Sequence, residues 1–256
     1  MIPVSIVIIT LNEEKNIKRC LDSVIDISDD ILIIDSDSKD KTVEICKQYK
    51  NVKVISNKFI DYSSQRNFGT ESAKYDYILN IDADEVLSEK LKKSILSLNI
   101  DNNKNIIYSF NRLNHYCLRP IKFGAWYPDV KRKFWNKNYA KWEGNVHETL
   151  KFKDKPQEIK LKGDLLHYTY DNPEEHFNRT IKYAILSAEK DFINGKKSNI
   201  LKLIFKPFLK FIFLFFFKLG FLDGYYGYLI AKTSAFSDFI RISVLISKNK
   251  KIVEKK

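Results

Sequence analysis

The sequence has few of the residues that would build a disulfide framework or a sequence-specific nucleic-acid surface. Its 256 residues include three cysteines, Cys20, Cys46 and Cys117, and their odd number and wide spacing fit neither a disulfide framework nor a metal site. Only seven of its 44 basic residues are arginine, the side chain preferred for bidentate contacts to bases. Because no helix-turn-helix or stacking-platform pattern is present, we expect no nucleic-acid partner. We also expect a reducing, cytoplasmic environment.

Long apolar runs are missing from the lysine-rich tail. Within residues 200–219 the longest uncharged run, residues 211–217, is far shorter than the ~20 apolar residues that a membrane span requires. The net charge of +12 favours an anionic partner. Residues 200–219 place lysines on one helical face and Phe, Leu and Ile on the other, a pattern typical of a helix lying on a membrane surface. Packing against the rest of the protein is the alternative, and Pro207 is expected to break or kink this helix.

Apolar runs alternate with helical patterns through the first hundred residues. Such alternation predicts a doubly wound, mostly parallel α/β sheet with a buried strand at the N-terminus in place of a signal peptide. Beyond residue 106 the pattern changes to a mixed or antiparallel region rich in aromatic and basic residues, and helix returns at residues 174–193. The expected parallel strands are residues 4–9, 30–34, 52–55 and 77–81.

Acidic residues follow three of these strands, where ligands bind parallel sheets. The fourth strand ends in Asp82-Ala-Asp84-Glu85, and clustered carboxylates repel one another unless a cation binds them. This run predicts a site for Mg²⁺ or Mn²⁺ and a diphosphate, with an acidic turn before a helix near Ser88 as the alternative. At the second strand end, Asp35 is predicted to contact a nucleotide.

Other polar residues at these strand ends suit helix caps. Asn12, Ser38 and Asp40 are all reasonable caps, because their short side chains accept backbone hydrogen bonds, and this structural role is favoured for Ser38 and Asp40. Glu85 is interpreted as an ordinary acid that leads into the following helix.

Four motifs in order resemble the nucleotide-sugar domain of inverting family-two glycosyltransferases. The resemblance covers about the first 170 residues and implies a GT-A-type fold. Three later blocks make the chain similar to bacterial lipopolysaccharide-core glucosyltransferases that act on a heptose: Trp142-Glu-Gly-Asn-Val-His-Glu148, Leu166-His-Tyr-Thr-Tyr170 and Gly220-Phe-Leu-Asp-Gly-Tyr-Tyr-Gly227. The four ordered motifs are Ser5-Ile-Val-Ile-Ile-Thr-Leu-Asn-Glu13, Asp35-Ser-Asp-Ser-Lys-Asp-Lys-Thr42, Gln65-Arg-Asn-Phe-Gly69 and Asn80-Ile-Asp-Ala-Asp-Glu85.

The resemblance also implies roles for individual residues in donor binding. It implies that Arg66 approaches the diphosphate or sugar, and that Asp82 contacts ribose or the water shell of the metal. Leu11 stands where many relatives have Tyr, and Asp37 where many have Gly; neither change removes an implied ligand. The residues implied to hold the uridine are Thr10, Glu13 and Asp35, and those implied to bind the metal are Asp84 and His167.

An inverting transfer needs a carboxylate that takes the proton from the acceptor hydroxyl. Glu148 is the predicted base because it follows an aromatic-rich segment and matches the family's position for a catalytic acid; Asp129 and Glu143 are its rivals. His147 is expected to orient Glu148 or to bind the acceptor, and Trp126 to bind the acceptor. Gly124 either lets the backbone approach the donor sugar or serves an ordinary turn.

We therefore expect a metal-dependent transfer of a sugar, taken as glucose, from a UDP-sugar to a lipid-linked core oligosaccharide. The expected location is the inner face of the cytoplasmic membrane. A polyprenyl-phosphate sugar transferase and a non-catalytic basic binding module are the alternatives. The expected domains are residues 1–170, with an acceptor region at 106–170, and residues 171–256, with a membrane-associating segment at 200–246.

Overall fold

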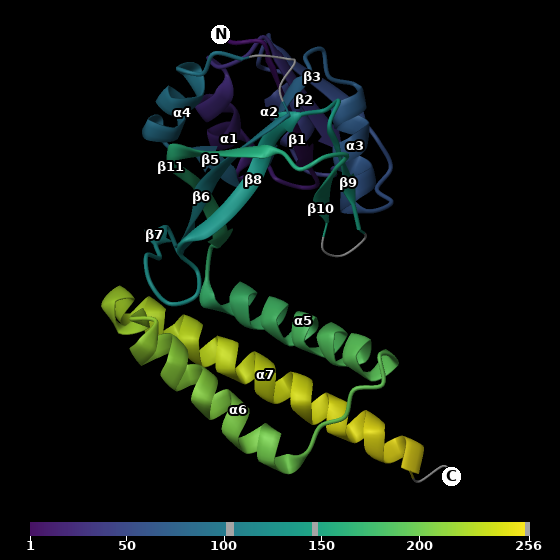
Figure 1. Cartoon of the computed structure of the whole chain (residues 1–256), viewed down its shortest axis with the longest axis vertical. Helices are drawn as coiled ribbons and strands as arrows, with labels where there is room; N and C mark the ends of the chain where they lie inside the picture. Colours follow the sequence, from purple (N-terminus) through teal and green to yellow (C-terminus); the bar gives the residue numbers. More distant parts are fainter. Residues whose placement is uncertain (101–104, 145–147, 254–256) are drawn as a thin grey trace. The chain divides into compact units, whose positions relative to one another are not determined.

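The structure is a computed structural model that describes residues 1–100, 105–144 and 148–253. The chain forms two compact units (Figure 1). The N-terminal unit comprises Met1–Arg112 and Asp129–His167, and the C-terminal unit comprises Leu113–Pro128 and Tyr168–Lys256. The segment 113–128 therefore groups with the C-terminal helices.

Four parallel strands form one half of the main sheet, in the order β3-β2-β1-β4. Their interiors are almost continuously apolar in β1, β2 and β4, as expected for strands covered on both faces. In the register of the sheet, Thr10 lies beside Asp35 and Ile9 beside Asp82, so the acidic strand ends converge on one edge. The strands are β1 Val4–Thr10, β2 Asp30–Asp35, β3 Val52–Ser56 and β4 Tyr77–Asp82.

The other half of the sheet continues as β8-β6-β11-β5 and contains antiparallel pairs, as the sequence predicted beyond residue 106. A short strand, β7, pairs with β6, and β9 and β10 form a separate two-stranded sheet. The strands are β5 Glu85–Leu87, β6 Ile106–Tyr116, β7 Arg119–Pro120, β8 Asp129–Asn136, β9 Ala140–Glu143, β10 Thr149–Phe152 and β11 Gln157–Tyr170.

Helices cover both faces of the parallel half, which confirms the doubly wound α/β class. Helices α1 and α4 pack into one apolar cluster, and Phe68 and Ala73, in and just after α3, pack into the other. Gly69 permits the close approach of α3, because a Cβ there would lie 2.4 Å from Val7 Cγ1. The helices are α1 Ile17–Val24, α2 Thr42–Cys46, α3 Tyr62–Glu71 and α4 Glu89–Leu96.

The C-terminal unit is mainly helical, and its long helix α7 packs against both α5 and α6 (Figure 1). Gly227 must be glycine, because a Cβ there would lie 1.8 Å from the carbonyl oxygen of Gly220. Between them, the Asp223 carboxylate accepts hydrogen bonds from the backbone N–H groups of Lys122 and Phe123. The elements are α5 Pro173–Ile193, α6 Ile200–Ile212, the π-helical turn η1 Phe213–Phe217, the 3-10 turn η2 Gly220–Asp223 and α7 Gly224–Val253.

The expected break at Pro207 does not occur, since α6 continues through it to Ile212. Proline removes one backbone donor, and a helix that packs along a neighbour such as α7 can retain its course despite that loss. Within the described ranges, no helix is both long and apolar enough to cross a membrane.

Candidate active site

The first two strand ends hold a buried hydroxyl–carboxylate pair. Thr10 Oγ1 donates a 2.9 Å hydrogen bond to Asp35, and Ser38 donates to the same carboxylate from its backbone N–H at 2.9 Å and its hydroxyl at 2.6 Å. Only 3% of Asp35 is exposed. These three donors fix the orientation of the carboxylate before any ligand arrives.

The loops after β1 and β2 are cross-linked by side chains. Asn12, with a positive φ of 56°, accepts a hydrogen bond from the backbone of Lys39 and donates its own N–H to Ser38 Oγ. The backbone N–H of Glu13 donates to Thr42 Oγ1 at 2.8 Å. Asn12 does not cap α1, whose N-cap is Asn16. Its side chain joins the two loops that carry Thr10, Glu13 and Asp35. The expected capping role of Ser38 is wrong, because the N-cap of α2 is Lys41 and the Ser38 hydroxyl donates to Asp35.

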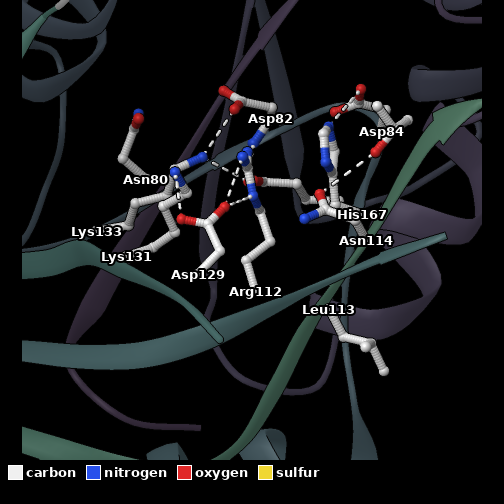
Figure 2. Close-up of polar contacts among 12 residues, drawn as sticks. Asn80, Asp82, Asp84, Arg112, Leu113, Asn114, Asp129, Lys131, Lys133 and His167 are labelled. Atoms are coloured by element: carbon white, nitrogen blue, oxygen red, sulfur yellow. Dashed lines mark hydrogen bonds and ion pairs between the residues drawn. The ribbon is translucent and has the colours of Figure 1, made fainter. Parts of the chain in front are cut away.

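Two buried cations hold Asp82 at the end of β4 (Figure 2). Arg66 from α3 binds one carboxylate oxygen at 2.7 Å, and Lys133 from β8 binds the other at 2.7 Å. Burial alone would raise the pKa of Asp82, but the charges of Arg66 and Lys133 hold it well below its usual range. Both oxygens of Asp82 therefore already have charged partners.

Glu85 is part of the same network, and its interpretation as a helix-leading acid was wrong. It begins β5, is fully buried, and accepts a 2.6 Å bond from Lys133 and a 2.9 Å bond from the backbone N–H of Asp82. Arg112 lies 3.4 Å from its other oxygen. A buried carboxylate requires such compensation. Sequence reasoning missed Lys133 and Arg112, although the basic character of their strands was visible.

Asp84 and His167 lie together beside this network (Figure 2). His167 Nε2 is 3.2 Å from Asp84 Oδ2, because β11 places His167 opposite Glu85 in the sheet. Both side chains are partly exposed, at 24% for Asp84 and 14% for His167. Among the residues that the structure describes, no group of three or more His, Cys, Asp or Glu side chains is placed to hold a metal ion. One carboxylate and one imidazole suit a divalent ion whose other ligands come from phosphate oxygens and water.

Arg66 also connects Asp82 with Glu148. Arg66 Nη2, the same nitrogen that binds Asp82, lies 3.5 Å from Glu148 Oε1, and the guanidinium stacks 5.1 Å from the Trp142 ring. Burial opposes the charge of Arg66, yet Asp82 and Glu148 raise its pKa above the ordinary value. The structure thus brings two predicted carboxylates, Asp82 and Glu148, to the buried guanidinium of Arg66, which was also predicted.

The rival base Asp129 belongs to the same charged network, because Arg112 contacts both Glu85 and Asp129 (Figure 2). Asp129 is bound by Arg112 at 2.8 Å and Lys131 at 3.0 Å, whereas Glu143 is exposed at the end of β9. His147 lies outside the described residues. Trp126 belongs to the C-terminal unit, where its ring contacts Tyr116, Tyr170 and His176. Its predicted role as an acceptor contact stays a prediction.

Gly124 serves a turn in the C-terminal unit. Its φ of +71° is a conformation that glycine adopts readily. Its backbone N–H donates a 2.9 Å hydrogen bond to the carbonyl of Lys218. An ordinary structural requirement therefore accounts for this glycine.

Residues 5–152 match the family model described as glycosyl transferase family 2. The chain belongs to glycosyl transferase family 2. An uncharacterized glycosyltransferase of Rickettsia typhi is 28% identical to it, over 94% of this chain and 86% of that protein. LpsC of Rhizobium meliloti, a lipopolysaccharide core biosynthesis glycosyltransferase, is 27% identical over 93% of this chain and 90% of its own. The chain is therefore a glycosyltransferase with a GT-A-type fold.

Among solved structures, Staphylococcus aureus TarS (residues 1–349) is similar to this family 2 chain, and the match covers 98% of this chain and 92% of the TarS chain. The TM-score is 0.48 and the sequence identity 14%.

Proposed function

We propose that this family 2 enzyme transfers glucose from UDP-glucose to a hydroxyl of a lipid-linked core oligosaccharide, with inversion at the anomeric carbon. The observation that carries the proposal is the joint placement of Arg66 against Asp82 and Glu148, beside the Asp84–His167 pair. The similarity to LpsC supports the class of acceptor.

The donor would bind along the edge where the parallel strands end. Thr10, Glu13 and Asp35 present hydroxyl and carboxylate oxygens that can accept hydrogen bonds from a uracil N–H or a ribose hydroxyl. The cross-links between the two loops hold this edge in place in the absence of ligand. Because both oxygens of Asp82 are bound by cations, it would serve the ribose or an outer hydration shell and would not be a direct metal ligand.

Asp84 and His167 would hold Mg²⁺ or Mn²⁺. When bound, the ion supplies positive charge to the diphosphate of the donor. Their donor atoms and partial exposure fit such an ion. Arg66 adds a fixed positive charge from the protein itself, which stabilises the negative charge that develops on the leaving UDP.

Glu148 would act as the general base. Its carboxylate accepts the proton of the acceptor hydroxyl as that oxygen attacks the anomeric carbon from the face opposite the diphosphate. The bond from the anomeric carbon to the diphosphate oxygen breaks, and its electron pair leaves with UDP. The 3.5 Å contact holds the Glu148 carboxylate beside Arg66, the side chain that would face the diphosphate of the donor.

Replacing Glu148 with Gln tests this assignment. We expect the rate of transfer to fall by about 10²- to 10⁴-fold, the usual contribution of a general base. The affinity for UDP should change little, because Gln retains the shape of the side chain. Glu143→Gln, at an exposed position of β9, is the matched control and should leave the rate unchanged. A loss below about threefold for Glu148→Gln would contradict a base and would favour a polyprenyl-phosphate acceptor, which needs none.

We also propose that α6 and η1 rest on the inner surface of the cytoplasmic membrane. No residue of α6 is buried. Lys202 would face anionic headgroups while the apolar side chains enter the interface. Lys206 and Lys210 instead lie 3.5 Å and 3.3 Å from Asp238 of α7. Each of the large apolar side chains in this set is at least half exposed: Ile200, Leu201, Ile204, Phe205, Phe208, Leu209, Phe213, Phe216 and Phe217.

A further inference from the structure

The C-terminal unit has a small cavity that opens to solvent and is lined by no residue of the donor site. Its volume is about 250 Å³. Pockets for drug-sized ligands range from about 300 to 1,000 Å³, so this cavity suits a single small ring. The segment 113–128, the end of β11 and helices α5, α6 and α7 all contribute side chains, among them Trp126, Tyr170, His176, Thr180, Tyr183 and Ser234.

Aromatic rings form one side of this cavity. Trp126 and Tyr170 lie with ring centroids 6.1 Å apart, and Tyr170 lies 4.6 Å from His176 at an interplanar angle of 30°. Tyr183, also on the lining, is 60% exposed. Aromatic faces carry negative charge from the π-system. They therefore match the slightly positive C–H groups on one face of a pyranose ring.

Hydroxyl groups supply the complementary polar contacts. Thr180 of α5 and Ser234 and Ser237 of α7 line the cavity, and each is only partly exposed. A hydroxyl both donates and accepts, as the hydroxyls of a sugar do. The combination of aromatic faces with convergent hydroxyls is typical of a site for a polyol ring.

The charges around the cavity favour a neutral ligand. Burial lowers the pKa of His176 to about 4, so its ring is uncharged at neutral pH. Its Nδ1 lies 3.2 Å from the hydroxyl of Tyr116. Lys210, the charged side chain on the lining, pairs with Asp238 at 3.3 Å. An anionic or cationic ligand would find no unpaired opposite charge among the lining residues.

We propose that this cavity binds one uncharged pyranose residue of the acceptor glycan. The inference rests on the proposed function, since it assigns part of the acceptor to the C-terminal unit. It also gives Trp126 a defined role as a face for sugar stacking. The donor-site residues are not required for this binding, so the two assignments can be tested separately.

The test uses the full chain and a panel of methyl glycosides of glucose, galactose, mannose and a heptose. Isothermal titration measures affinity. Fluorescence reports the site, because Trp126 lines the cavity, whereas the other two tryptophans, Trp135 and Trp142, are buried in the N-terminal unit. We expect at least one glycoside to bind saturably and to change the emission of Trp126. Binding by none of the four would overturn the proposal.

Two variants locate the binding. Ser234→Leu should fill the cavity and abolish glycoside binding. Thr180→Val keeps the side-chain shape and should weaken binding by about two- to tenfold, the worth of one hydrogen bond. Thr233→Val, at a buried α7 position outside the lining, is the matched control and should bind like the wild type. Unchanged affinity in both Ser234→Leu and Thr180→Val would refute the site.

Thermal stabilisation by UDP with Mn²⁺ is measured on the same samples. Loss of glycoside binding in Ser234→Leu with UDP stabilisation intact supports the cavity assignment and shows that the variant is folded. Stabilisation by UDP without any glycoside binding in the wild type refutes the cavity assignment alone. Glycoside binding without UDP stabilisation supports the cavity and counts against the proposed function.

Discussion

Removing the Lys133 ammonium should destabilise the N-terminal unit strongly. Lys133 is buried and lies 2.7 Å from Asp82 and 2.6 Å from Glu85. In Lys133→Met the methylene volume is largely kept, but both carboxylates lose a charged partner. Glu85, fully buried, would keep only Arg112 at 3.4 Å and the backbone N–H of Asp82.

The expected cost is about 3–5 kcal/mol in the free energy of unfolding, as found when one partner of a buried ion pair is removed. Urea denaturation followed by circular dichroism measures this difference. Lys131→Met is the control, because Lys131 is 28% exposed and its pair with Asp129 should contribute less than about 1 kcal/mol.

A second substitution separates the charge from the volume. Adding Glu85→Gln to Lys133→Met removes the buried negative charge that has lost its partner, so the double variant should be more stable than Lys133→Met alone. A cost below about 1 kcal/mol for Lys133→Met, or a double variant less stable than the single one, would refute the reasoning.

Three further predictions concern other parts of the molecule. As pH falls from 6.5 toward 4, the unfolded chain protonates His176 before the folded chain does, so the C-terminal unit should lose up to about 3 kcal/mol of stability; His176→Phe should remove this part of the pH dependence in melting curves, and an unchanged slope would contradict it. Gly69→Ala should cost about 1–3 kcal/mol in urea denaturation, because the new methyl group overlaps Val7, and a neutral effect would argue against the close packing of α3. Replacing Lys202 by Glu should reduce binding to anionic phospholipid vesicles in sedimentation assays by about fivefold, because one lysine near the surface contributes about 1 kcal/mol, whereas equal binding would exclude α6 as the contact.

The parallel half of the sheet was predictable because its strands are short apolar runs separated by helical patterns. The edge where Thr10, Asp35 and Asp82 meet followed from the rule that parallel strands end on the same side. Local pattern and topology were sufficient for these features, since neither depends on contacts between distant side chains.

The partners of Glu85 could not be predicted in the same way. Lys133 is 48 residues away and Arg112 is 27 residues away, and each reaches Glu85 only because the antiparallel half of the sheet aligns the strands in a particular register. The run Asp82-Ala-Asp84-Glu85 does not by itself reveal which of its carboxylates becomes buried. Glu85 was therefore interpreted as an ordinary acid leading into the following helix.

The C-terminal unit shows a similar limit. The helical pattern predicted α5 and α6, but the effect of Pro207 depends on packing along α7. The cavity beside Trp126 requires side chains from the segment 113–128, β11 and three helices. No local pattern indicates that such distant segments line one cavity.

Thermal unfolding with UDP and Mn²⁺ tests the central claim most directly, namely that the carboxylates at the strand ends bind a nucleotide sugar with a divalent ion. At a UDP concentration about 100 times the dissociation constant, the wild type should melt about 5–10 °C higher with both ligands present. Asp84→Asn should lose this shift, and Asp26→Asn, at an exposed surface pair with Lys92, should keep it. Absence of any shift in the wild type, or an equal shift in Asp84→Asn, would contradict the account.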